Sequence, residues 1–194
     1  MRDLFFGDRR DRVKWAVLVH LARANRLRTI LQVAYARCTE NPSLEGPGRS
    51  IPVDHAVWQF FSALERVSEL GPSLGVAIEV LDAPFAHTSR ASYAALVKDR
   101  ISHLERPALV FLDPDTGISD SPDAMHASRA EVRLVWGALQ PREWLVVYQH
   151  ADHTSTWLDR RRNLLKDWCG RVDVAVYTGR QIAGDVAFLA VEKR

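Results

Sequence analysis

Short apolar runs that no polar residue interrupts recur along this sequence. The clearest are Ala108–Leu112 (ALVFL) and Trp144–Tyr148 (WLVVY). A strand with one face in water alternates apolar and polar side chains, so a continuous run predicts a strand that is covered on both faces. Such double coverage is typical of a parallel sheet with helices on each side.

Further apolar runs and helical segments alternate with these two. Strands are also predicted over residues 29–35, 75–81, 172–177 and 186–191. Apolar residues at helical spacing predict helices over 12–24, 57–67, 89–105, 129–139 and 154–168, with Ser89 as the cap of the third. The pattern predicts an α/β fold with a doubly wound, mostly parallel sheet, and the short loop 178–184 makes the C-terminal strand antiparallel.

Length and composition limit the class of protein. A chain of 194 residues fits one core, so we expect a single domain over residues 1–194. Cys38 and Cys169 lack the spacing of a disulfide framework or a zinc site. Since no signal peptide or membrane-spanning run is evident, we expect a cytoplasmic protein without a membrane partner. A net charge of +2 does not by itself indicate nucleic-acid binding.

One group of polar residues precedes the first predicted helix. Gly7 is followed by Asp8, Asp11 and Lys14, which lie three residues apart. On a helical first turn these three side chains share one face and could orient an anion or a ligand amine. The same spacing also fits a helix N-cap with a surface ion pair.

Two further polar groups follow predicted strands directly. Asp113 and Asp115 belong to the turn DPDTG after ALVFL, and Gln149 and His150 follow WLVVY. Ligands of doubly wound sheets bind at the carboxyl ends of the strands, so these groups are predicted to meet in one crevice. Carboxylates can hold a substrate amine, Gln149 can bind an amide-like edge, and His150 can transfer protons near neutral pH. A β-turn capped by Asp113, and a histidine that only bonds a loop carbonyl, are the structural alternatives.

Two motifs resemble those of a known enzyme family. The run G-D-x-x-D-x-x-K-W from Gly7 is similar to the G-N-x-x-D-x-x-K-H motif before the first strand of bacterial ribosomal RNA adenine methyltransferases. The run FLDPD is similar to their strand ending in D-P-P-Y. The whole chain resembles more closely a family of uncharacterised bacterial proteins with the motifs G-D-x-x-D-x-x-K, F-L-D-P-D-x-G and V-x-Y-Q-H.

The resemblance implies a methyltransferase-like Rossmann fold and an S-adenosylmethionine cofactor. It implies that the segment with Gly7, Asp8 and Asp11 binds the cofactor and that Lys14 approaches the cofactor's carboxylate. Asp113 would then hold the target amine of a nucleobase or nucleic acid, together with Gln149. Where those enzymes carry a glycine-rich loop after the first strand, this chain has residues 33–37 (VAYAR).

Two other functions remain open from the residues alone. In the first, Asp8, Asp113, Asp115 and His150 gather a divalent metal ion and the chain is a phosphodiesterase or nuclease. The basic helix that carries Arg160, Arg161, Arg162 and Lys166 would hold the phosphates of the substrate. In the second, the crevice binds a nucleotide and no bond is broken, so the chain is a non-catalytic binding module.

Overall fold

The computed structural model describes residues 8–36, 43–46, 49–52, 64–152 and 154–194. Its helical elements are α1 (Arg9–Ala24), η2 (Leu64–Leu70), α3 (Gly71–Leu74), η3 (His87–Ser89), α4 (Arg90–Ser102), α5 (Arg129–Ala138) and α6 (Trp157–Trp168). Its strands are β1 (Thr29–Val33), β2 (Ser43–Gly46), β3 (Arg49–Pro52), β4 (Ala77–Leu81), β5 (Ala108–Leu112), β6 (Gly117–Ile118), β7 (His126–Ala127), β8 (Trp144–His150), β9 (Ala175–Gly179) and β10 (Ala183–Glu192). The helix predicted over 57–67 lies mostly outside the described residues.

Six of these strands form the central sheet, in the order β4-β1-β5-β8-β10-β9. β4, β1, β5 and β8 are parallel, whereas β10 runs antiparallel to both of its neighbours. The predicted mostly parallel sheet with an antiparallel C-terminal strand is therefore confirmed. None of the helices in the described segments has the length and apolar character needed to cross a bilayer.

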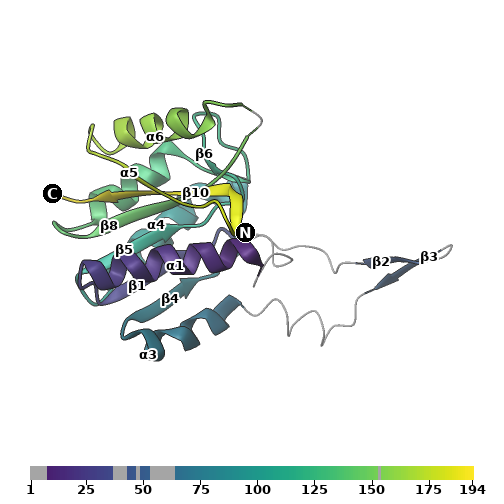
Figure 1. Cartoon of the computed structure of the whole chain (residues 1–194), viewed down its shortest axis with the longest axis horizontal. Coiled ribbons are helices and arrows are strands. Elements are labelled where there is room, and N and C mark those ends of the chain that lie inside the picture. The colour runs from purple at the N-terminus through teal and green to yellow at the C-terminus, as the bar shows by residue number, and fades with distance from the viewer. Residues whose placement is uncertain (1–7, 37–42, 47–48, 53–63, 153) are drawn as a thin grey trace.

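Helices cover the sheet on both faces, as Figure 1 shows. One face packs against α1, with Phe111, Val146 and Phe188 among its buried side chains. The other face packs against α4, α5 and α6, with Val110 and Val147 among its buried side chains. Because successive strand residues point to opposite faces, this double burial explains the uninterrupted apolar runs. We call these two sides the α1 face and the α4–α6 face.

Local sequence explains where two helices begin. Asp8 caps α1, since its Oδ1 accepts hydrogen bonds from the backbone N–H groups of Arg10 (2.7 Å) and Asp11 (3.1 Å). Ser128 caps α5 in a reciprocal capping box with Glu131. Ser89 occupies the N-cap position of α4, as predicted, but its side chain makes no capping hydrogen bond, because its hydroxyl donates instead to the carbonyl of Ala86 (3.2 Å).

The direction in which the chain crosses the sheet reverses between β1 and β5. From β1 the chain continues to β4 on one side, and from β4 it crosses to β5 on the other side. Such a reversal is a topological switch point, where ligands of open α/β sheets bind outside the carboxyl ends of the strands. We call this side of the sheet the carboxyl edge and the opposite side the amino edge.

Candidate active site

A buried ion-pair cluster lies where α1 crosses the carboxyl edge of the sheet. Nζ of Lys14 lies 2.5 Å from Oδ1 of Asp11 and 2.8 Å from Oδ2 of Asp113. All three residues are buried. Burial by itself lowers the pKa of Lys14, but the charges and hydrogen bonds of Asp113 and Asp11 outweigh it and raise that pKa above its ordinary value. One ammonium between two carboxylates leaves the cluster with a net negative charge.

Gln32 of β1 completes this cluster, and the sequence reading missed it. Its Nε2 donates to Oδ2 of Asp113 at 2.7 Å, and the residue is fully buried. Its Oε1 is buried without a hydrogen-bond partner among the described residues. The signal in the sequence was a single polar residue inside the apolar run TILQV. Buried amides need partners, so this residue should have indicated a polar neighbour on the adjacent strand.

A second charged group lies at the start of α1 on the same edge. Nη2 and Nε of Arg10 donate to Oδ2 of Asp185, at 2.5 and 3.0 Å. Nε2 of His150 lies 3.5 Å from the same oxygen, and Nδ1 of His150 lies 2.9 Å from the carbonyl oxygen of Ala151. The hydrogen bond from Arg10 is the main reason that the pKa of Asp185 is lowered from its ordinary value. Sequence reading missed Asp185 because its partners are distant along the chain.

His150 and Asp113 therefore occupy one side of the sheet in two separate groups. Strand alternation points both side chains to the α1 face, but His150 contacts Asp185 whereas Asp113 contacts Lys14. Asp8 serves as the cap of α1 and lies within 3.7 Å of Arg10. Gly7 lies outside the described residues.

Gln149 points to the opposite face and holds a loop. Its Oε1 accepts from the backbone N–H of Ile118 (3.1 Å), and its Nε2 donates to the carbonyl of Thr116 (2.7 Å). Gly117 packs against this amide so closely that an added Cβ would lie 2.1 Å from Oε1 of Gln149. The amide is thus engaged with the loop that begins at Asp113, and Asp115 in that loop is partly exposed.

The end of β1 has an unusual backbone that the sequence did not reveal. Tyr35 has φ +48°, a left-handed conformation that glycine adopts far more readily. Its backbone N–H donates to the hydroxyl of Tyr93 (3.1 Å), and its ring packs against Phe85 and Tyr93. Asp82, which is exposed, follows β4 directly on the neighbouring strand. Sparsely populated backbone conformations concentrate at binding sites, which indicates the switch point as a functional region.

The groups that the metal hypothesis needs do not assemble within the described residues. No set of three or more histidine, cysteine, aspartate or glutamate residues among them is arranged to hold a metal ion. The basic helix α6 also has structural partners. Arg160 pairs with Asp152, Arg161 donates to the carbonyl of Ile118 (2.7 Å), and Arg162 donates to the carbonyl of Val174 (3.0 Å).

The chain is similar in fold to two solved structures, although no protein-family model and no curated protein matches its sequence. A protein from Thermobifida fusca, assigned provisionally as a methyltransferase, aligns with 96% of this chain and 80% of its own length at 13% identity, with a TM-score of 0.51. A DUF574 family protein from Streptomyces avermitilis aligns with 96% of this chain and 82% of its own length at 12% identity, with a TM-score of 0.47. The alignment with the Thermobifida fusca protein shows that the chain has a methyltransferase-like α/β fold.

Proposed function

We propose that this chain binds S-adenosylmethionine at the carboxyl edge of β4, β1 and β5 and methylates an amine of a nucleobase or nucleic acid. One observation supports this most directly. Oδ2 of Asp113 accepts hydrogen bonds from both Lys14 and Gln32, whereas Oδ1 accepts none from the described residues. Asp113 is thus a fixed carboxylate at the switch point, with one oxygen left for a ligand.

The residues around the switch point fit a nucleoside cofactor. The left-handed backbone at Tyr35 provides the turn that a glycine-rich loop would otherwise supply. Asp82 stands at the end of the strand next to β1, where doubly wound sheets place a carboxylate for ribose hydroxyls. The cofactor, when bound, supplies an electrophilic methyl group. The negative charge of the cluster of Asp11, Lys14 and Asp113 favours a cationic ligand or a hydrogen-bond donor beside it.

In this proposal each side chain has a distinct role. Oδ1 of Asp113 accepts a hydrogen bond from the target amine and fixes the direction of its lone pair. Lys14 and Gln32 are positioning residues, because both donate to Oδ2 of Asp113 and hold the carboxylate in place in a buried site. Gln149 positions the loop after Asp113 rather than contacting the base, since its amide is engaged by that loop. Asp115 and His150 line the approach to the site.

A transfer assay tests the activity. The protein is incubated with S-adenosylmethionine labelled on its methyl group and with total RNA or fragmented DNA, and label in the nucleic acid is counted. We expect incorporation that is lost in Asp113→Ala and retained in Asp159→Ala, an exposed carboxylate on α6. Cofactor binding without incorporation into any acceptor would instead support a non-catalytic binding module.

A further inference from the structure

Arginines occupy strained backbone positions in three loops at the amino edge. Among the described residues, the non-glycine positions with positive φ are Arg26 (53°), Tyr35 (48°), Arg142 (71°) and Arg171 (65°). The three arginines precede β1, β8 and β9 respectively. Glycine or asparagine would adopt this conformation at lower cost, so an arginine at all three positions needs an explanation beyond the turn itself.

These three arginines are also exposed, and no partner for them lies among the described residues. None of their guanidinium groups has an ion-pair or hydrogen-bond partner in the part of the chain that the structure describes, although other basic residues at the same edge do. Three acids at the amino edge pair with other residues: Glu105 with Arg28, Glu143 with Arg106 and Asp173 with Arg194. Arg26, Arg142 and Arg171 are therefore cations that pair with no acid in the described segments.

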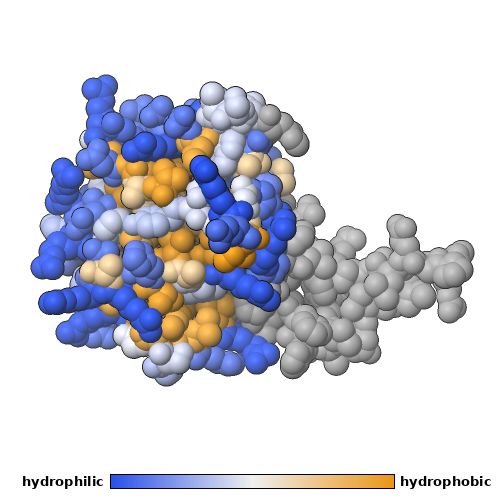
Figure 2. Space-filling model, viewed as in Figure 1, coloured by the Kyte–Doolittle hydropathy of each residue, from blue (hydrophilic) through white to orange (hydrophobic). Residues whose placement is uncertain are grey.

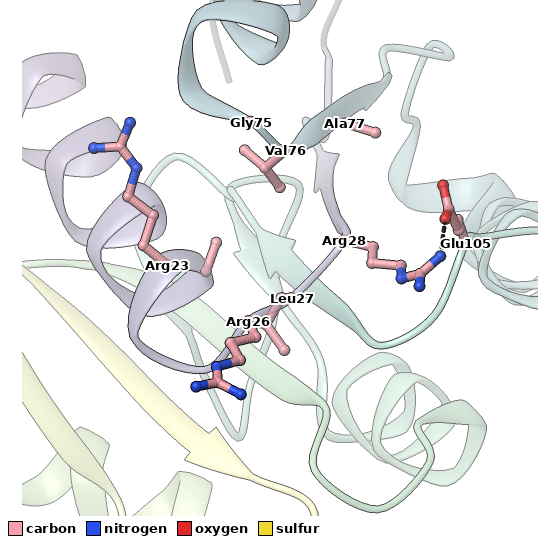
Figure 3. A pocket seen from close by; sticks show the side chains of 9 residues that line it. Arg23, Arg26, Leu27, Arg28, Gly75, Val76, Ala77 and Glu105 are labelled. Carbon is pink, nitrogen blue, oxygen red and sulfur yellow. Dashed lines mark hydrogen bonds and ion pairs between the residues drawn. The ribbon is translucent and has the colours of Figure 1, made fainter.

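One of the three belongs to an open hollow of about 540 Å³ between the amino ends of β1 and β4. Figure 3 shows Arg23, Arg26 and Arg28 fanning outward around its rim, with Arg28 turned toward Glu105. Arg23 is held loosely, since its Nε and Nη2 lie 3.4 Å from the carbonyl of Leu74. Because the guanidinium groups diverge, they fit an extended anion along the edge better than one compact anion inside the hollow.

The loops place these cations at regular intervals. In the strand order, β1, β8 and β9 are the second, fourth and sixth positions, so their ends lie about 10 Å apart from one to the next. The six strand ends together span about 24 Å, the length of about seven successive phosphates along one strand of a duplex. This edge lies on the left in Figure 1, and Figure 2, in the same view, shows hydrophilic residues along it.

We propose that the amino edge of the sheet binds the phosphate backbone of a nucleic acid. Unpaired arginines at regular spacing match a linear array of phosphates, and such contacts give position rather than base specificity. An anionic membrane would favour apolar side chains beside the cations. In the described residues the exposed large apolar side chains are Leu70, Leu96 and Ile182, none of which belongs to these three loops.

This surface is distinct from the proposed cofactor site, which lies at the opposite edge of the sheet. It would hold a distant part of a long nucleic acid, and it would do so whether or not the chain is a methyltransferase. The two proposals have separate tests, so the failure of one does not contradict the other.

The test measures binding of a fluorescein-labelled DNA duplex two helical turns long, and of the corresponding RNA duplex, by fluorescence anisotropy at about 50 to 200 mM salt. The variant is Arg26→Gly/Arg142→Gly/Arg171→Gly, because glycine suits the positive φ and should leave the thermal midpoint unchanged or raise it. The matched control is Arg129→Gln/Arg133→Gln/Arg180→Gln, which removes the same charge from exposed arginines outside these loops.

We expect the glycine variant to bind at least about tenfold more weakly. For DNA, the slope of log affinity against log salt concentration should become shallower by about 2.7, which is the contribution of three phosphate contacts. The control variant should keep most of the affinity. An equal loss in both variants would overturn the proposal, as would the absence of wild-type binding to either duplex. Binding to vesicles of equal parts phosphatidylcholine and phosphatidylserine, but to neither duplex, would also overturn it.

Discussion

Lys14 and Asp113 are ninety-nine positions apart in the sequence, yet Nζ of the lysine lies 2.8 Å from Oδ2 of the aspartate in a buried site. The pair joins α1 to the end of β5 across the α1 face of the sheet. Burying a carboxylate costs free energy unless it is paired and hydrogen-bonded, and here Lys14 and Gln32 both compensate that cost. The contact therefore contributes to stability and fixes the position of the Asp113 carboxylate in the candidate site.

Replacing this lysine should be severely destabilising. Lys14→Met leaves the buried carboxylates of Asp11 and Asp113 without their shared cation, which should lower the free energy of unfolding by about 3 to 5 kcal/mol. The double variant Lys14→Met/Asp113→Asn should recover part of this loss, because one of the two uncompensated charges is gone. Urea unfolding at neutral pH measures both. A loss below about 1 kcal/mol in the single variant would mean that the pair contributes as little as a surface salt bridge.

Gly117 should be intolerant of any side chain. In Gly117→Ala the new Cβ would lie 2.1 Å from Oε1 of Gln149, and φ at this position is +114°. We expect a loss of more than about 2 kcal/mol, measured by thermal or urea unfolding. Gly170→Ala is the matched control, because its φ is +84° but nothing lies near the added Cβ, so only a backbone cost of about 1 kcal/mol is expected. Equal losses in the two variants would contradict the packing of Gln149 on Gly117.

The pair of Arg10 and Asp185 should make stability depend on acid pH. The hydrogen bond from Arg10 lowers the pKa of Asp185 below 3.8, so its stabilising effect is present above that value and is lost as pH falls through the folded-state pKa. Arg10→Met should therefore be less stable than wild type at pH 7, and the gap should narrow below pH 3.8. Urea unfolding over this range measures the gap. A gap that stays constant with pH would show that Asp185 is not the group involved.

Asp82 should affect cofactor binding without affecting the fold. Its side chain is exposed at the end of β4, so Asp82→Asn should leave the thermal midpoint unchanged. If this carboxylate binds ribose hydroxyls, the affinity for S-adenosylhomocysteine should fall at least about tenfold, the effect of losing a hydrogen bond to a charged group. Asp173→Asn, an exposed aspartate near the amino edge, is the control and should bind normally. Equal affinity in both variants would remove Asp82 from the site.

The fold was predictable because double coverage of a strand leaves a direct trace in the sequence. The runs ALVFL and WLVVY correspond to β5 and to the first five residues of β8, since every residue in them packs against one layer of helices or the other. Strand ends were less predictable. The run predicted over 172–177 became β9 over Ala175–Gly179, because pairing with β10, which no local pattern encodes, determines its extent.

The site was predictable only in part, for reasons of geometry. Lys14 and Asp113 do meet, but their third partner, Gln32, comes from a strand whose polar residue looked incidental. Gln149 and His150 are adjacent in the sequence, yet alternation along β8 sends them to opposite faces of the sheet. The pleat of β8 thus separates the side chains of Gln149 and His150, although one motif contains both. Asp185 reaches His150 from β10, the last strand.

Calorimetric titration with S-adenosylhomocysteine is the sharpest test of the proposed cofactor site, because it requires no knowledge of the methyl acceptor. We expect saturable binding of one ligand per chain that weakens in Asp82→Asn and stabilises the folded protein against heat. No heat of binding at millimolar ligand, from a protein that unfolds cooperatively, would contradict it.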